Sequence, residues 1–114
     1  MCLNFNGELK TGEVEIVAEV LGRWLGEVHT KIRVIGAEVS FEDERCSVWC
    51  HNDGSVPGVP PSFLIEGSFK GQAKDARKWL EELKQGCMAA DLGYDIEFVE
   101  VDTEGMPMTV EEQV

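Results

Sequence analysis

The chain has 114 residues, 43% of them hydrophobic, with 22 acidic residues against 10 basic ones and a formal net charge of −12. This length and composition predict one globular domain and exclude a disordered chain. The excess of acids argues against a nucleic-acid partner and against an anionic membrane surface, since both are bound through clustered Lys and Arg.

The opening residues lack the basic start and the apolar stretch of a signal peptide. The whole sequence holds no apolar run long enough to cross a bilayer. We therefore expect a cytoplasmic protein with no membrane partner. The four cysteines are expected to be free thiols, because disulfides persist mainly in oxidising compartments.

The N-terminal third permits two interpretations. An apolar stripe at helical spacing comprises Val14, Val17, Leu21, Trp24, Leu25, Val28 and Ile32. Such a stripe is typical of an amphipathic helix. However, the segment is rich in β-branched residues and holds Gly22 and Gly26, which disfavour a helix. Residues 13–20 are therefore also compatible with a strand, and the period alone leaves both interpretations open.

The clearest element is a strand–helix–strand unit from about residue 62 to residue 102. Apolar residues at helical spacing predict a helix over residues 72–85, with Gly86 at its C-terminal cap. The flanking segments 62–69 and 94–101 alternate apolar and polar residues, as strands do when one face is buried and the other is wet. This pattern predicts an α+β fold, an antiparallel sheet with helices on one face.

Short motifs recur in the two halves of the chain. The segment Phe5-Asn-Gly resembles Ile65-Glu-Gly, and Ile35-Gly-Ala resembles Leu92-Gly-Tyr. If the halves are degenerate copies, the order of elements is a ferredoxin-like βαββαβ. The alternative is a β-rich N-terminal half followed by one βαβ unit.

The repeat also sets the predicted domain organisation. Residues 42–61 have no counterpart in it, so we expect them to form an insert within a single α+β domain of residues 1–102. The first part of this insert is expected to extend a strand or to form a hairpin, and the second part, rich in Gly and Pro, to form a long loop. Residues 103–114 are predicted to be a loosely ordered acidic tail.

The predicted insert holds the densest group of potential ligands. Within a strand, Cys46 and Cys50 would lie about 13 Å apart, too far for one metal ion, so we expect no metal and no cofactor. Trp49 precedes a loop rich in Gly and Pro, and such loops concentrate binding residues. The resulting hypothesis is a site for a small apolar or cationic ligand. Its predicted residues are Trp49, Cys50, His51 and Asp53.

Three functions compete. The first is a non-enzymatic binding module, a homodimer that buries its exposed sheet face and binds a small molecule or a protein near residues 42–61. The second is a small enzyme using Cys50, His51 or nearby carboxylates, although adjacent residues of a strand face opposite ways. The third is an acidic decoy that occupies a nucleic-acid-binding protein. No catalytic motif is present, so binding is preferred to catalysis.

Overall fold

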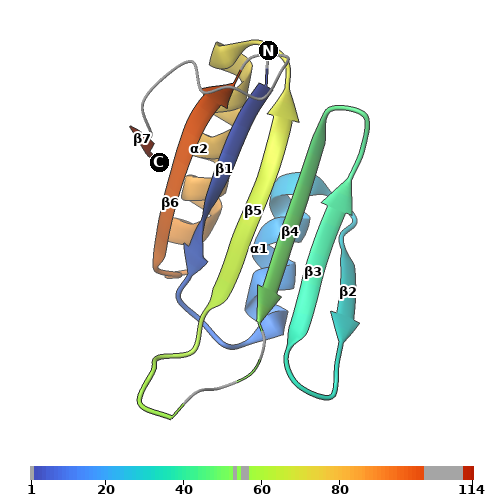
Figure 1. Cartoon of the computed structure of the whole chain (residues 1–114), viewed down its shortest axis with the longest axis vertical. Helices are drawn as coiled ribbons and strands as arrows, with labels where there is room; N and C mark the ends of the chain where they lie inside the picture. Colours follow the sequence, from blue (N-terminus) through green and yellow to red (C-terminus); the bar gives the residue numbers. More distant parts are fainter. Residues whose placement is uncertain (1, 53, 55–56, 102–111) are drawn as a thin grey trace.

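A computed structural model describes residues 2–52, 54, 57–101 and 112–114 of the chain. Its seven strands form one antiparallel sheet in the order β2-β3-β4-β5-β1-β6-β7 (Figure 1). Along the chain the elements are β1 (Cys2–Leu9), α1 (Val14–Leu25), β2 (His29–Ile32), β3 (Ala37–Glu42), β4 (Cys46–Asn52), β5 (Phe63–Lys70), α2 (Ala73–Ala89), β6 (Tyr94–Val101) and β7 (Glu112–Gln113). The predicted α+β class is confirmed.

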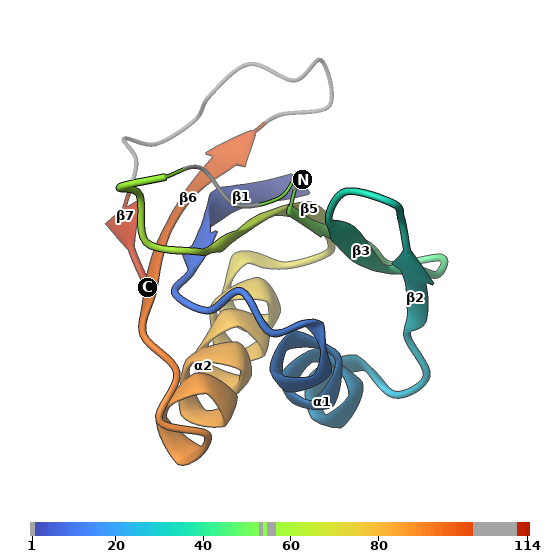
Figure 2. The same ribbon diagram turned by 90° about the horizontal axis from the view of Figure 1, so that it is seen from below.

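Both helices lie on the same face of the sheet (Figure 2). The opposite face, called the open face below, is covered by no helix in the part of the chain that the structure describes. Alternation along each strand sends apolar side chains towards the helices, as with Leu3, Phe5 and Leu9 of β1, which are all buried. The predicted strands with one buried and one wet face are confirmed in β5 and β6. The core is therefore a single layer between the sheet and the helices.

The N-terminal third contains a helix, so the interpretation of residues 13–20 as a strand is wrong. Val17, Val20 and Leu21 of α1 are buried, which outweighs the low helix propensity of this segment. The indole Nε1 of Trp24 donates a hydrogen bond of 2.7 Å to the backbone oxygen of Trp79, which fastens α1 to α2. After α1 the chain turns and forms the four-residue strand β2.

The helix α2 runs past its predicted end. The prediction of a cap at Gly86 is wrong, because the apolar stripe continues to Cys87, which is completely buried, and the helix reaches Ala89. The left-handed residue that follows it is Asp91, with a φ of 53°. The burial of Cys87 therefore stabilises helical structure beyond Gly86.

The first recurring motif has a direct explanation in the pairing of β1 with β5. Phe5 lies opposite Gly67, and Gly7 lies opposite Ile65. A Cβ at Gly67 would come within 2.7 Å of the Phe5 ring. Each strand therefore carries a glycine where the other strand places a large side chain, so the resemblance follows from strand pairing without any duplication.

The specific ferredoxin-like arrangement is not confirmed. Three strands rather than one separate α1 from β5. In the sheet, β1 lies between β5 and β6 and pairs antiparallel with both. The strand β3 is not adjacent to β1, because β4 and β5 lie between them. The predicted insert of residues 42–61 contains β4, a strand of the central sheet whose Val48 and Cys50 are buried.

Most of the predicted tail lies outside the described residues. Its last residues, 112–114, run along β6: β7 pairs with Glu97 and Phe98, and Val114 packs against the core. Arg77 of α2 forms ion pairs with Glu112 at 2.7 Å and with Glu100 at 3.3 Å. Neither helix in the described part of the chain has the length and apolar character needed to cross a membrane.

Candidate functional site

The open face of the sheet carries the side chains that alternate with the core residues. On β4, Val48 and Cys50 point towards the helices, which leaves Trp49 and His51 on the open face. The strand register places Trp49 opposite Glu66 of β5 and His51 opposite Leu64. The middle of the open face is therefore formed where β4 and β5 lie side by side.

Trp49 and His51 form a stacked aromatic pair on this face. Their ring centroids are 4.0 Å apart and their planes differ by 18°. Trp49 is 38% exposed, so part of the indole is open to solvent although one face is occupied by the imidazole. Aromatic rings attract cations through their negatively charged faces, and a half-exposed tryptophan held by stacking is well suited to that contact.

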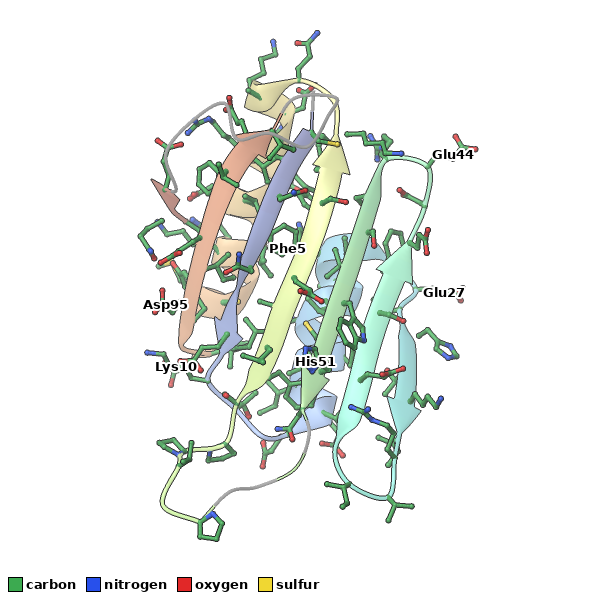
Figure 3. All side chains as sticks on the ribbon, viewed as in Figure 1. Phe5, Lys10, Glu27, Glu44, His51 and Asp95 are labelled. Atoms are coloured by element: carbon green, nitrogen blue, oxygen red, sulfur yellow. The ribbon has the colours of Figure 1, made fainter. Side chains whose placement is uncertain are left out.

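A shallow depression with a volume of about 440 Å³ lies beside this pair and extends across β5, β1 and β6. In Figure 3, His51 and Asp95 mark its two sides. It is lined by Asn6, Gly7, Glu8, His51, Leu64, Ile65, Glu66, Asp95 and Glu97. Four of these residues are carboxylates and none is Lys or Arg, so the depression is acidic.

The carboxylates are crowded by the strand register. Glu8 lies directly opposite Asp95 across β1 and β6, an arrangement that is destabilising for like charges. The side-chain amide of Gln113 donates a hydrogen bond of 2.8 Å to Glu97, which orients that carboxylate at the rim. A bound cation would relieve the repulsion between Glu8 and Asp95, so the arrangement is suited to holding positive charge.

The structure brings together two of the four predicted site residues. Trp49 and His51 share the open face, whereas Cys50 is completely buried and points into the core. Burial raises the pKa of the Cys50 thiol far above its ordinary range. Cys50 therefore contributes to packing and does not reach the depression. Asp53 lies outside the described residues.

Burial also raises the pKa of Cys46 and of Cys87 to about 11. These thiols remain protonated at neutral pH, and a protonated thiol is a poor nucleophile. The described residues contain no group of three or more His, Cys, Asp or Glu side chains that could hold a metal ion. The thiols of Cys46, Cys50 and Cys87 are therefore not activated nucleophiles, and the depression is lined by His51 and four carboxylates instead.

Sequence reasoning missed the residues that supply most of the charge, Glu8, Glu66, Asp95 and Glu97. The acids of the last strand are visible as an acidic stretch, and Glu8 and Glu66 occupy outward positions of their strands. Their convergence depends on the position of β1 between β5 and β6, which no local pattern reveals.

The chain matches no protein-family model, no curated protein and no solved structure. The functional inference therefore rests on the geometry and the charge of the open face.

Proposed function

We propose that the protein is a non-enzymatic binding module that holds an organic cation, an ammonium or a guanidinium group, in the depression on its open face. The single observation that carries the proposal is the pairing of the Trp49–His51 stack with a depression lined by four carboxylates and by no Lys or Arg. The carboxylates supply charge-assisted hydrogen bonds, and the aromatic pair supplies a π surface at the margin.

The charge of the open face bears on the predicted homodimer. A two-fold interface through this face would bring the acids of one copy onto the acids of the other, which costs free energy unless cations lie between them. The same charge attracts a basic ligand. The homodimer and the acidic decoy stay predictions, and the open face favours a cationic ligand over a second copy of the chain.

The proposal is tested by titrating the chain with spermidine, agmatine and choline, and with neutral glycerol as a control. Isothermal titration calorimetry measures affinity, and two-dimensional NMR locates the site. We expect saturable binding of at least one cation, with shifts concentrated at residues 47–51, 64–66 and 95–97. Affinity should fall with added salt, because the pairs are partly exposed.

A pair of charge-matched variants decides whether the depression is the site. Glu66→Gln removes one carboxylate from the lining and should weaken binding about fivefold, the size of a partly exposed ion pair. Glu44→Gln removes the same charge at the β3–β4 turn, away from His51 (Figure 3), and should leave the affinity unchanged. Equal losses in both variants, or the absence of saturable binding, would contradict the proposal.

A further inference from the structure

The strand β2 forms one edge of the sheet. Within the described part of the chain it pairs with β3 alone, and all four of its residues are exposed. An edge strand presents unpaired backbone N–H and C=O groups that can accept another strand. At the opposite edge the chain itself supplies the short strand β7, which pairs with β6. Among the described residues, no strand pairs with the outer side of β2.

The helices stop short of β2. Ile32 lies opposite Ala37 and shares its face of the sheet, yet Ile32 is 67% exposed while Ala37 is buried. Figure 2 shows β2 beyond the helix layer. A cavity of about 290 Å³ opens beside Ile32, and Val14 of α1 and Phe63 of β5 also line it. A strand added along β2 could therefore place an apolar side chain next to this cavity.

The strand β2 itself carries one basic residue, Lys31, and no acid, and Arg33 follows it directly. The nearest acids are Glu27, before the strand, and Glu38, on the neighbouring strand β3. The register places Lys31 on the open-face side of β2, opposite Glu38, and alternation places Ile32 on the helix side. The edge thus offers a positive group on one side and an apolar surface on the other.

We propose that β2 is a docking edge for an extended acidic–apolar segment of a partner protein, which adds to the sheet as a further strand. Backbone hydrogen bonds would supply affinity, and alternating side chains would supply selectivity, with an acid beside Lys31 and an apolar residue beside Ile32. A second copy of this chain fits less well, because two-fold pairing of β2 would bring Lys31 close to the basic residues of the other copy's β2. The residues of β2 do not line the acidic depression. The docking proposal and the cation-binding proposal can therefore fail independently.

The test uses the full chain and three fluorescent peptides, each acetylated and amidated. The first has the sequence Val-Thr-Val-Glu-Val-Thr-Val, the second carries Lys in place of the central Glu, and the third is the first with alternate backbone nitrogens methylated. Fluorescence anisotropy measures affinity, and NMR shifts locate the contact. We expect the glutamate peptide to bind about fivefold more tightly than the lysine peptide, with shifts centred on residues 29–32.

Three variants of the chain sharpen the test. Lys31→Glu should reverse the preference between the first two peptides, whereas Lys74→Glu, the same change at an exposed position of α2, should leave the preference as it is. The methylated peptide should lose binding, because it cannot form the strand ladder. Lys31→Gln, which should abolish the preference without reversing it, checks the result independently.

Several outcomes would overturn the proposal. They are equal binding of the acidic and basic peptides, undiminished binding of the methylated peptide, a Lys74→Glu effect as large as that of Lys31→Glu, and no binding at all. Concentration-dependent self-association of the free chain that Lys31→Gln alters would show that a second copy occupies the edge, and would overturn it equally.

Discussion

The two faces of the sheet are made from the same strands and differ in almost every physical respect. On β4, Cys50 is completely buried against the helices, whereas its neighbours Trp49 and His51 form an exposed aromatic stack. On β1, Phe5 packs among aromatic rings while Asn6 lines the acidic depression. The helix-covered face therefore carries the packed core, and the open face carries the aromatic pair and the carboxylates of the candidate site.

The largest expected effect of a substitution is in the covered face. Phe5 lies 5.5 Å from the Trp79 ring and 6.3 Å from the Trp24 ring, centroid to centroid. Phe5→Ala should therefore lower the free energy of unfolding by about 3–5 kcal/mol, as measured by urea denaturation. The matched open-face change Asn6→Ala should alter it by no more than about 0.5 kcal/mol. Similar losses for the two variants would refute the division between the faces.

A smaller loss is expected from Gly67→Ala. The added methyl group would lie 2.7 Å from the Phe5 ring and would also approach the backbone oxygen of Ser47, so the strands must shift. We expect a loss of about 1–3 kcal/mol in the free energy of unfolding. Gly22→Ala is the control, because a Cβ at that helical position meets nothing within 4 Å and alanine favours a helix. If Gly67→Ala proves as harmless as Gly22→Ala, the steric explanation of the recurring motif is wrong.

The pairing of Phe5 with Gly67 illustrates why single helices and strands are predictable from the sequence while the order of the strands in the sheet is not. Local periods encode the presence of α2 and of its two flanking strands, although they do not give the C-terminal end of the helix. The order of the strands depends on contacts between segments far apart in the chain, such as Phe5 with Gly67. A pairing rule between β1 and β5 therefore resembles an internal repeat in the sequence, and the central position of β4 in the sheet is not visible there.

The same distinction applies to the candidate site. Alternation along one strand is enough to place Trp49 and His51 on the opposite side of the sheet from Cys50. The meeting of Glu8 with Asp95 requires β1 to lie beside β6, and the order of elements along the chain does not contain that information. Local patterns thus locate the aromatic half of the site and leave its acidic half to the tertiary structure.

The next effect concerns a buried thiol and alkaline pH. Burial raises the pKa of Cys87 from 9.0 to about 11 in the folded chain, so the unfolded chain loses its proton first as pH rises. Ionisation of this thiol contributes no pH dependence well below pH 9, and between about pH 9 and pH 11 it should lower the free energy of unfolding. The contribution of Cys87 to the slope should be at most about 1.4 kcal/mol per pH unit, added to the contributions of Cys46 and Cys50, whose pKa values are also raised. Cys87→Ala should make the decline shallower in urea denaturation at several pH values, and an unchanged slope would count against this cause.

The smallest effect tests what the open face is for. Glu8 and Asp95 lie directly opposite each other, so Glu8→Gln should remove a like-charge repulsion and raise the free energy of unfolding by about 0.2–1 kcal/mol at low salt. The gain should shrink as salt screens the charges, and Glu44→Gln at the β3–β4 turn should show no comparable gain. The same Glu8→Gln change should weaken the binding of spermidine or agmatine, because it removes one of the carboxylates that line the depression. If Glu8→Gln raises the free energy of unfolding and weakens cation binding, the close carboxylates destabilise the fold and contribute to ligand binding. If neither the free energy of unfolding nor the affinity changes, Glu8 and Asp95 have no role beyond that of surface charges.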